Sequence, residues 1–302
     1  MSIFNSINTN RQAVFALQSL NQNNAELNAV QKRVSTGFRV SDSQDDSGAF
    51  SVAQTVRSDM AGVTAVNEQL GGTRGILATT LTALTQVSNT MQQLRTTATR
   101  LADGAITADS RTQYEGQYRD LVGQIRSFVA DATYNGRSLL VTQGTLNIGA
   151  GGSINGGNIT GLRNEAGNEY TINATDGAAL IVGGAGITGT AAISVPTSAA
   201  DAQALIQGGI ATSGTGANFA SVEARINSAL GRFGSSAAIV DNQINYNSKR
   251  LDALADGLGA LVDADLAKES ARMKGLETRQ QLSLQTLSMA NQTPQSLLSL
   301  FR

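Results

Sequence analysis

Only one stretch of the sequence has the spacing of a known binding motif, and it lies in the middle of the chain. Residues 184–189 read G-A-G-I-T-G, which is the G-x-G-x-x-G spacing, and they follow the apolar run 179–182. In a dinucleotide-binding fold these glycines let a helix N-terminus approach a pyrophosphate, so a helix must begin there. Instead, residues 190–195 favour strand and end at Pro196, and no βαβ repeat surrounds them. The glycine spacing alone therefore does not indicate a nucleotide-binding site.

No other combination of residues predicts an active site. Histidine and cysteine are absent, which excludes the usual zinc sites, Ser-His-Asp triads and Cys-His dyads. None of the four lysines follows a serine by three positions, and no G-x-x-x-x-G-K-[ST] occurs. The adjacent carboxylates Asp45 and Asp46 stand in the polar linker 38–48, where we interpret them as helix N-caps. We expect a protein that is not an enzyme and that holds no cofactor and no metal.

The composition favours narrow apolar contacts between helices, here called seams, over a large globular core. The 302 residues include no tryptophan and only 4% aromatic residues. A net charge of −1 offers no basic stripe for nucleic acid and permits self-association. No run approaches the ~18 apolar residues of a membrane span, and the N-terminus lacks the pattern of a cleaved signal. We expect a soluble protein with no nucleic-acid partner and no membrane insertion.

Two long apolar seams bracket the chain. Residues 222–261 place apolar side chains at alternating steps of three and four, with Asn247 as the one plainly polar member. Such a helix is ~60 Å long at 1.5 Å per residue, and it cannot bury this seam by itself. A matching seam covers 56–101, with an interruption around Gly71, Gly72 and Gly75. We expect the two seams to pair through Leu77, Leu81, Leu84, Met91, Val222, Ile226, Phe233, Val240, Ile244, Leu251, Leu254 and Leu258.

Cap and stop signals predict where the helices begin and end. One begins at Gln12 and stops at Gly37, and the long helix that follows runs from about Ala49 to Asp103. The last helix resumes its apolar period at Met273 after a break at 263–269. Thr293 is of a residue type that caps helices, and Pro294 is of a type common at the first helical position. Together they predict that a separate final turn starts there.

The middle of the chain predicts smaller elements. A capping box at Ser110 and Gln113 opens a helix that ends near Ala132, Asn135-Gly136 marks a turn, and 138–148 reads as a hairpin broken at Gly144. Residues 149–216 are rich in small polar residues, with predicted strands at 169–173, 179–182 and 191–195 and a short helix at 198–207. The fold class is therefore mainly α: a long antiparallel helical bundle or coiled coil of the paired N- and C-terminal regions, with a β-hairpin and a small β-rich insertion at the tip.

Five ordered blocks of sequence carry a resemblance to a known family. They read SINTN (6–10), VSTGFRVSDSQDDSGAFSVAQ (34–54), YNGRSLL (134–140), VDADLAKE (262–269) and ANQTPQSLLSLFR (290–302). Together they resemble a bacterial flagellin of the alphaproteobacterial type. A flagellin-like hook-filament junction protein is the nearest alternative. A cytoplasmic coiled-coil scaffold would explain the seams but not the blocks, and an enzyme with its site in 149–216 is disfavoured by the lack of histidine and cysteine.

The resemblance implies a structural subunit that self-assembles into the extracellular filament used for swimming. It also implies five segments: an inner-core helix (1–42), the N-terminal outer core (43–148), a surface-exposed variable insertion (149–216), a C-terminal outer-core helix (217–262) and a C-terminal inner-core helix (263–302). The implied partners are other copies of the chain, the flagellar export apparatus, a flagellin chaperone, the filament cap and the hook-filament junction proteins. The implied inner-core contacts are Leu17, Leu20, Leu27, Val30, Val34, Leu284, Leu287, Leu297, Leu298, Leu300 and Phe301.

The family also implies a site read by the vertebrate Toll-like flagellin receptor. Its stimulatory pattern resembles Q-R-V-R-E-L-A-V, and residues 92–99 of this chain read Q-Q-L-R-T-T-A-T. Gln93 replaces an arginine, Thr97 replaces a leucine, and Gln117 stands where a glutamate is usual. These three departures predict weak activation of the receptor.

Overall fold

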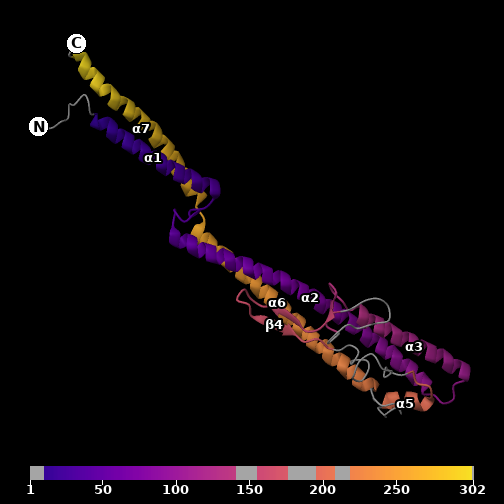
Figure 1. Ribbon diagram of the computed structural model, residues 1–302. Coiled ribbons are helices and arrows are strands. Elements are labelled where there is room, and N and C mark those ends of the chain that lie inside the picture. The colour runs from indigo at the N-terminus through magenta and orange to yellow at the C-terminus, as the bar shows by residue number, and fades with distance from the viewer. Residues whose placement is uncertain (1–9, 141–154, 176–194, 208–217, 301–302) are drawn as a thin grey trace. The chain divides into compact units, whose positions relative to one another are not determined.

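The structure is a computed structural model that describes residues 10–140, 155–175, 195–207 and 218–300, and of residues 155 and 293–300 the backbone alone. Long helices dominate it (Figure 1). The chain divides into two compact units, a terminal unit of residues 1–60 and 252–302 and a central unit of residues 61–251. The helices α2 (Ser47–Leu101) and α6 (Phe219–Val262) each contribute residues to both units. The prediction of a mainly α fold built from paired N- and C-terminal regions is confirmed.

One hydrophobic core holds the central unit together. The seam of α2 from Val66 to Leu101 packs there with α3 (Ala108–Asp131) and with the seam of α6 from Phe219 to Val240. Leu84, Met91 and Phe233 are almost fully buried. Because each helix offers a continuous apolar stripe, the core extends along the helices, as the spacing of the seams predicts.

The glycines at 71, 72 and 75 do not interrupt α2. A Cβ at Gly75 would lie 2.8 Å from the Tyr134 ring, so the missing side chain provides the space in which this ring packs. Tyr134 begins the predicted Asn135-Gly136 turn, in which both central residues have positive φ, 49° and 74°. This turn is confirmed, and positive φ at both positions is what a tight reversal of type I′ requires.

The predicted capping box of α3 is wrong. Thr107 is the N-cap, and its hydroxyl accepts a hydrogen bond from the Ser110 backbone N–H. Ser110 lies inside the first turn, where its own hydroxyl accepts a hydrogen bond from the Thr107 hydroxyl at 3.0 Å. Threonine is itself a good N-cap, so α3 is capped three residues before the predicted N-cap, Ser110.

Part of the middle segment packs into the central core. Strand β3 (Ile159–Leu162), which was not predicted, pairs antiparallel with β4 (Glu169–Ile172), which was. Ile159 and Ile172 face each other in this register, and both are buried in the same core as Phe233. Helix α5 (Ala199–Gln207), also predicted, adds Ala202 and Leu205 to this core.

The predicted hairpin 138–148 lies mostly outside the described residues. Of its beginning, β1 (Arg137–Ser138) pairs in parallel with β2 (Asn155–Gly156). The predicted strand 179–182 and residues 191–194 of the strand 191–195 also lie outside the described part of the chain.

The loop between β3 and β4 is attached to both long helices of the central unit. Arg250 of α6 forms a two-pronged ion pair with Glu165. Gln69 of α2 accepts a hydrogen bond from the Leu162 backbone, and Gln243 of α6 donates one to the Arg163 carbonyl. The hairpin is therefore fixed across α2 and α6 by polar contacts in addition to its buried isoleucines.

The terminal unit contains the first and last helices. Helix α1 (Arg11–Thr36) ends at Gly37, whose φ of 75° closes the helix in the left-handed conformation as predicted. Helix α7 (Leu266–Leu300) starts earlier than expected, because the Asp265 side chain accepts from the backbone N–H groups of Ala267 and Lys268. It continues through Pro294, so the predicted separate final turn is wrong.

A short segment between α1 and α2 packs onto the end of α6. The backbone N–H groups of Arg39 and Val40 both donate to the Val262 carbonyl, and Phe38 forms an isolated β-bridge with Asp263. Val40, Ala53 and Val262 form a small buried cluster at this point. Asp46 caps α2 by accepting from the Gly48 and Ala49 backbone, which agrees with its interpretation as a cap.

Candidate assembly interface

Helices α1 and α7 lie side by side and antiparallel within the terminal unit (Figure 1). Three polar contacts mark their register along the pair. Asn10 donates to the Ala290 carbonyl at 2.7 Å, Gln280 donates to Asn24 at 2.7 Å, and Arg33 lies 3.7 Å from Glu269. The start of α1 therefore lies beside the last third of α7, and the end of α1 lies beside the start of α7.

The buried apolar cluster between the two helices lies toward the end of α1 and the start of α7. It consists of Leu27, Val30 and Leu276, with Val34 and Met273 partly buried beside them. Leu20 of α1 is also buried but lies outside this cluster. Burying one such side chain contributes about 1.5–3 kcal/mol. This cluster is small compared with the core of the central unit, so the pair has little apolar burial of its own.

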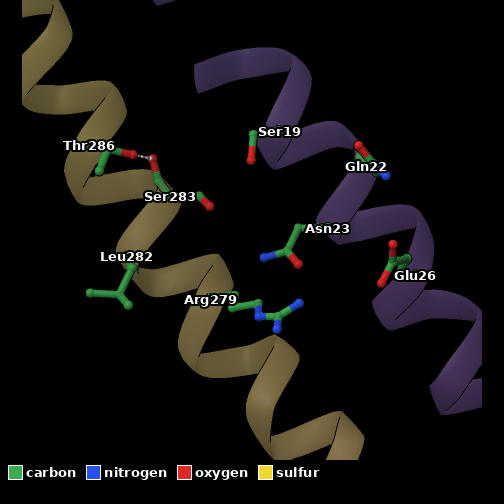
Figure 2. Close-up of a pocket in the computed structure, with 8 residues that line it drawn as sticks. All are labelled: Ser19, Gln22, Asn23, Glu26, Arg279, Leu282, Ser283 and Thr286. Carbon is green, nitrogen blue, oxygen red and sulfur yellow. Dashed lines mark hydrogen bonds between the residues drawn. The ribbon is translucent and has the colours of Figure 1, made fainter. Parts of the chain in front are cut away.

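The other half of the pair has a polar groove between its helices. Figure 2 shows Asn23 pointing from α1 toward α7, and Arg279 extending from α7 toward Glu26. The groove encloses about 460 Å³ and is lined by Ser19, Gln22, Asn23, Glu26, Arg279, Leu282, Ser283 and Thr286. Asn23 is 9% exposed, and its amide nitrogen has no hydrogen-bond acceptor among the described residues. The contact here is therefore mostly polar and adds little hydrophobic stabilisation.

Large apolar side chains lie on the outside of this same half. Phe15 is 70% exposed and Val14 is 63% exposed in α1, and Met289 is 58% exposed in α7. A helix pair that is polar inside and apolar outside is inverted relative to a helix pair in a stable monomer. Exposed apolar side chains gathered on two adjacent helices indicate a surface that another molecule covers.

The predicted inner-core residues divide between these two environments. Leu20, Leu27 and Val30 are buried, Val34 and Leu287 are partly buried, and Leu17 and Leu284 are about half exposed, at 48% and 52%. The side chains of Leu297, Leu298, Leu300 and Phe301 lie outside the described residues. The prediction did not include Asn23 or Leu276 in this set. The helical spacing would have reached both: Asn23 lies four residues before Leu27. Leu276 lies on the same face as Leu287, at steps of three and four through Ser283 and Gln280.

The residues predicted for the outer seam lie mostly in the central core. Leu258 packs instead with the cluster around Val262, and Leu251 and Leu254 are half-buried outside both clusters. The members that pack in the central core are Leu77, Leu81, Leu84, Met91, Val222, Ile226, Phe233, Val240 and Ile244.

The three residues predicted for the receptor site do not share one surface environment. Gln93 and Gln117 are exposed. Thr97 is only 6% exposed, and its hydroxyl donates to the Gln93 carbonyl at 3.1 Å. A threonine at this position therefore belongs to the wall of the central core and offers little surface to a partner.

Charged groups meet where α1 joins the linker. The Lys32 ammonium bonds to Asp42 at 2.6 Å and to Asp45 at 3.1 Å. The Ser41 backbone N–H, and after it the Lys32 ammonium, lower the pKa of Asp45 to about 2. The pKa of Asp42 is also lowered, chiefly by Lys32, and that of Lys32 is raised, chiefly by Asp42. The two carboxylates thus hold the linker to α1.

The described residues contain no group of three or more acidic side chains arranged to hold a metal ion. None of their helices is long and apolar enough to cross a bilayer.

Comparison with known proteins gives the family. Residues 7–145 match the bacterial flagellin N-terminal helical region, and residues 220–301 match the bacterial flagellin C-terminal helical region. The chain is 32% identical to flagellin FljM of Caulobacter vibrioides over 99% of each chain. It is 33% identical to a flagellin of Brucella melitensis over 98% of this chain and 99% of the relative.

A solved structure shares the fold. A protein described as a flagellar hook-associated protein from Vibrio parahaemolyticus has a TM-score of 0.56 at 14% identity, over 72% of this chain and 100% of that chain. At this identity the likeness concerns the fold alone, whereas the full-length relatives from alphaproteobacteria share both sequence and order of segments. The chain therefore belongs to the bacterial flagellin family.

Proposed function

We propose that this flagellin polymerises into the flagellar filament through α1 and α7, and that these two helices become ordered when neighbouring subunits cover them. The observation that carries the proposal is the inverted polarity of the pair. In the half of the pair that holds the groove, Phe15, Val14 and Met289 are exposed, while the space between the helices is lined mostly by polar side chains. Contact between copies would bury these side chains and remove the exposed apolar surface.

The proposed coupling between folding and assembly follows from how little the pair buries alone. Its two helices contain 26 and 35 residues, but among the side chains that the structure describes only Leu27, Val30 and Leu276 form a buried apolar cluster between them. Ordering a backbone costs about 1–2 kcal/mol per residue. A chain with this ratio of ordered residues to buried side chains behaves as a segment that folds on binding.

A segment that folds on assembly is compatible with export in an unfolded state. We propose that the chain leaves the cell through the flagellar export apparatus, with a chaperone holding the terminal segments before assembly. In the filament it would contact other copies of itself and, at the ends, the cap and the hook-filament junction proteins. The five segments bounded at 42, 148, 216 and 262 are the proposed inner-core, outer-core and insertion regions.

The test is seeded growth of the purified protein. Short filament seeds or a precipitating salt are added to the monomer, and the products are imaged by negative-stain electron microscopy. Long uniform tubes support a self-sufficient filament subunit. Rings, short caps or soluble monomers alone would contradict it and favour a junction protein.

Removal of residues 297–302 sharpens this test. The segment contains Leu297, Leu298, Leu300 and Phe301, which we propose pack between copies. The truncated chain should fail to elongate seeds, while its circular dichroism and denaturation midpoint match those of the full chain. Growth at the normal rate would exclude a role for this segment in assembly.

We also propose that the protein activates the Toll-like flagellin receptor weakly. Gln93 and Gln117 expose neutral amides where the stimulatory pattern has charged groups, and Thr97 is buried. A reporter-cell assay measures this directly, and strong activation at low concentration would refute it.

A further inference from the structure

The polar groove between α1 and α7 contains a buried amide donor without an acceptor. Asn23 of α1 is 9% exposed, and its Nδ2 has no hydrogen-bond acceptor among the described residues. Figure 2 shows this side chain directed from α1 across the groove toward α7. Because a buried amide donor without an acceptor is unfavourable, Asn23 favours a ligand that brings an acceptor atom into the groove.

A second donor group reaches the same groove from the other helix. Arg279 of α7 lines the groove, and Figure 2 shows its guanidinium extending toward α1, next to the Asn23 amide. This guanidinium forms no hydrogen bond and no ion pair with any residue that the structure describes. A guanidinium is always charged and presents five N–H donors in a fixed plane that matches the oxygens of a carboxylate or phosphate. Asn23 and Arg279 can therefore donate to one acceptor group between them.

The acidic side chain in the groove does not neutralise Arg279. Glu26 is the one acidic residue among the eight that line the groove, and its Oε2 lies 3.7 Å from a guanidinium nitrogen of Arg272. Arg272 itself is not among the lining residues. Two guanidinium groups and one carboxylate thus meet at this part of the pair. The local charge is positive and favours a bound anion.

The space and the other lining residues favour a small polar ion over a larger ligand. The groove encloses about 460 Å³, and its one apolar lining residue is Leu282. This volume holds a small ion together with several waters, since each water occupies about 30 Å³. Ser19 and Ser283 add hydroxyl groups that can donate to the same ion. A metal cation would need acceptor ligands where the groove presents the Arg279 guanidinium.

We infer that the groove between α1 and α7 binds one small free oxyanion, of the class of inorganic phosphate or sulfate, through Asn23 and Arg279. The donors come from both helices, so the bound ion connects α1 to α7 in the half of the pair that the apolar cluster does not reach. Arg279 is exposed, so an ion can enter from solvent. The inference rests on the proposed function, because the pair is ordered in the filament. An ion that binds only the ordered pair favours assembly.

The test measures bound phosphate and the critical concentration for seeded growth on the same samples. Filaments of the full chain are grown with radiolabelled inorganic phosphate and sedimented, and the phosphate in the pellet is counted per subunit. A site with one guanidinium and one amide should bind phosphate with a Kd on the order of 1 mM and saturate near about one ion per subunit. At about 10 mM phosphate, the critical concentration should then be about 10-fold lower than in chloride of equal ionic strength.

Two substitutions remove the proposed donors. Arg279→Gln and Asn23→Leu should each raise the Kd for phosphate about 10-fold or more. About 10 mM phosphate should then lower the critical concentration less than about 2-fold in these variants. Lys274→Gln is the matched control, because it removes the same charge from α7 at a residue that pairs with Glu277 at 2.9 Å outside the groove. It should leave the Kd within about 2-fold of that of the unchanged chain.

Asn23→Leu also separates ligand binding from packing. Leucine has a similar size but no donor, so this variant should grow in chloride at least as well as the unchanged chain and lose only the response to phosphate. An equal response to phosphate in the unchanged chain and both variants would show a general salt effect and would overturn the inference. Poor growth of both variants in chloride, with no phosphate bound to the unchanged chain, would assign the groove to a carboxylate of a neighbouring copy and would also overturn it.

The remaining outcomes separate this site from the proposed function. If the unchanged chain forms no tubes with seeds, the proposed function fails and the inference of an oxyanion site fails with it. Normal tubes that retain no phosphate at concentrations well above the expected Kd would overturn the inference alone.

Discussion

The central unit and the α1–α7 pair are built from similar helices but distribute their apolar side chains in opposite ways. In the central unit, Leu84, Met91 and Phe233 point inward, and α3, α5 and the β3–β4 hairpin cover the same core. In the pair, Phe15 and Met289 point outward, and a polar groove lies between the helices. The first arrangement is complete within one chain, whereas we propose that other copies of the chain complete the second.

This difference indicates that one region stabilises the subunit and the other promotes its assembly. The central unit supplies the stability of the isolated subunit, because its burial needs no partner. In the proposed function, the α1–α7 pair supplies the driving force for assembly, because contact with neighbouring copies would bury its exposed apolar side chains such as Phe15. Mutations in the two regions should therefore change two different measured quantities.

Phe233→Ala should have the largest effect on the monomer. Phe233 is 1% exposed in the central core, and removing a buried phenylalanine ring lowers the free energy of unfolding by about 3–5 kcal/mol. Denaturant unfolding followed by circular dichroism measures it. Ile239→Ala is the control on the same helix, since Ile239 is 47% exposed and should change the free energy of unfolding by less than about 0.5 kcal/mol. Equal losses in the two variants would contradict the packing described here.

Phe15→Ser should impair assembly and leave the stability of the monomer unchanged. Phe15 is 70% exposed, so the unfolding midpoint of the monomer should stay unchanged. Its burial between copies is worth about 1.5–3 kcal/mol, so the critical concentration for seeded growth should rise about 10–100-fold. Asn21→Ser, another exposed site on α1, should leave growth unchanged. A loss of monomer stability in Phe15→Ser without a loss of growth would break the comparison.

Acid should have the smallest effect, confined to the linker between α1 and α2. The pKa of Asp45 is about 2 in the folded chain, against about 3.9 for an unperturbed aspartate. A depressed pKa stabilises the folded linker fully above pH ~4, and this contribution is lost as the pH falls toward ~2. A solid-state NMR titration of the Asp45 carboxyl in the filament, where the account has α1 ordered, should give a midpoint near 2. A midpoint near 4 would show that Ser41 and Lys32 do not hold Asp45 in the assembled chain.

The long periodic elements could be predicted from the sequence, and several local features could not. The seams of α2 and α6, the stop at Gly37 and the Asn135-Gly136 turn each follow from a local rule that the structure obeys. The cap of α3 was misplaced because Thr107 and Ser110 are both competent caps. Helix α7 runs through Pro294 although proline usually marks a boundary, and the Asn10 donor at Ala290 is a contact between residues 280 positions apart.

The candidate interface was predicted as a set of residues, but its polarity was not. A helical period shows that one face is apolar without showing whether the same chain or another copy covers it. For that reason Leu17 and Leu284 were grouped with Leu27 and Val30, although the structure exposes the first two and buries the others. The buried Ile159 of β3 was missed because a four-residue strand with a glycine has too little pattern to detect.

The central claim is tested most directly by amide hydrogen exchange of the monomer and of the filament, measured by mass spectrometry on the same chain. We predict that in the monomer residues 12–34 and 276–300 exchange rapidly while residues 77–101 are protected, and that all three segments are protected in the filament. Strong protection of residues 12–34 and 276–300 in the monomer would show that α1 and α7 fold without neighbours, and would contradict the coupling of their folding to assembly.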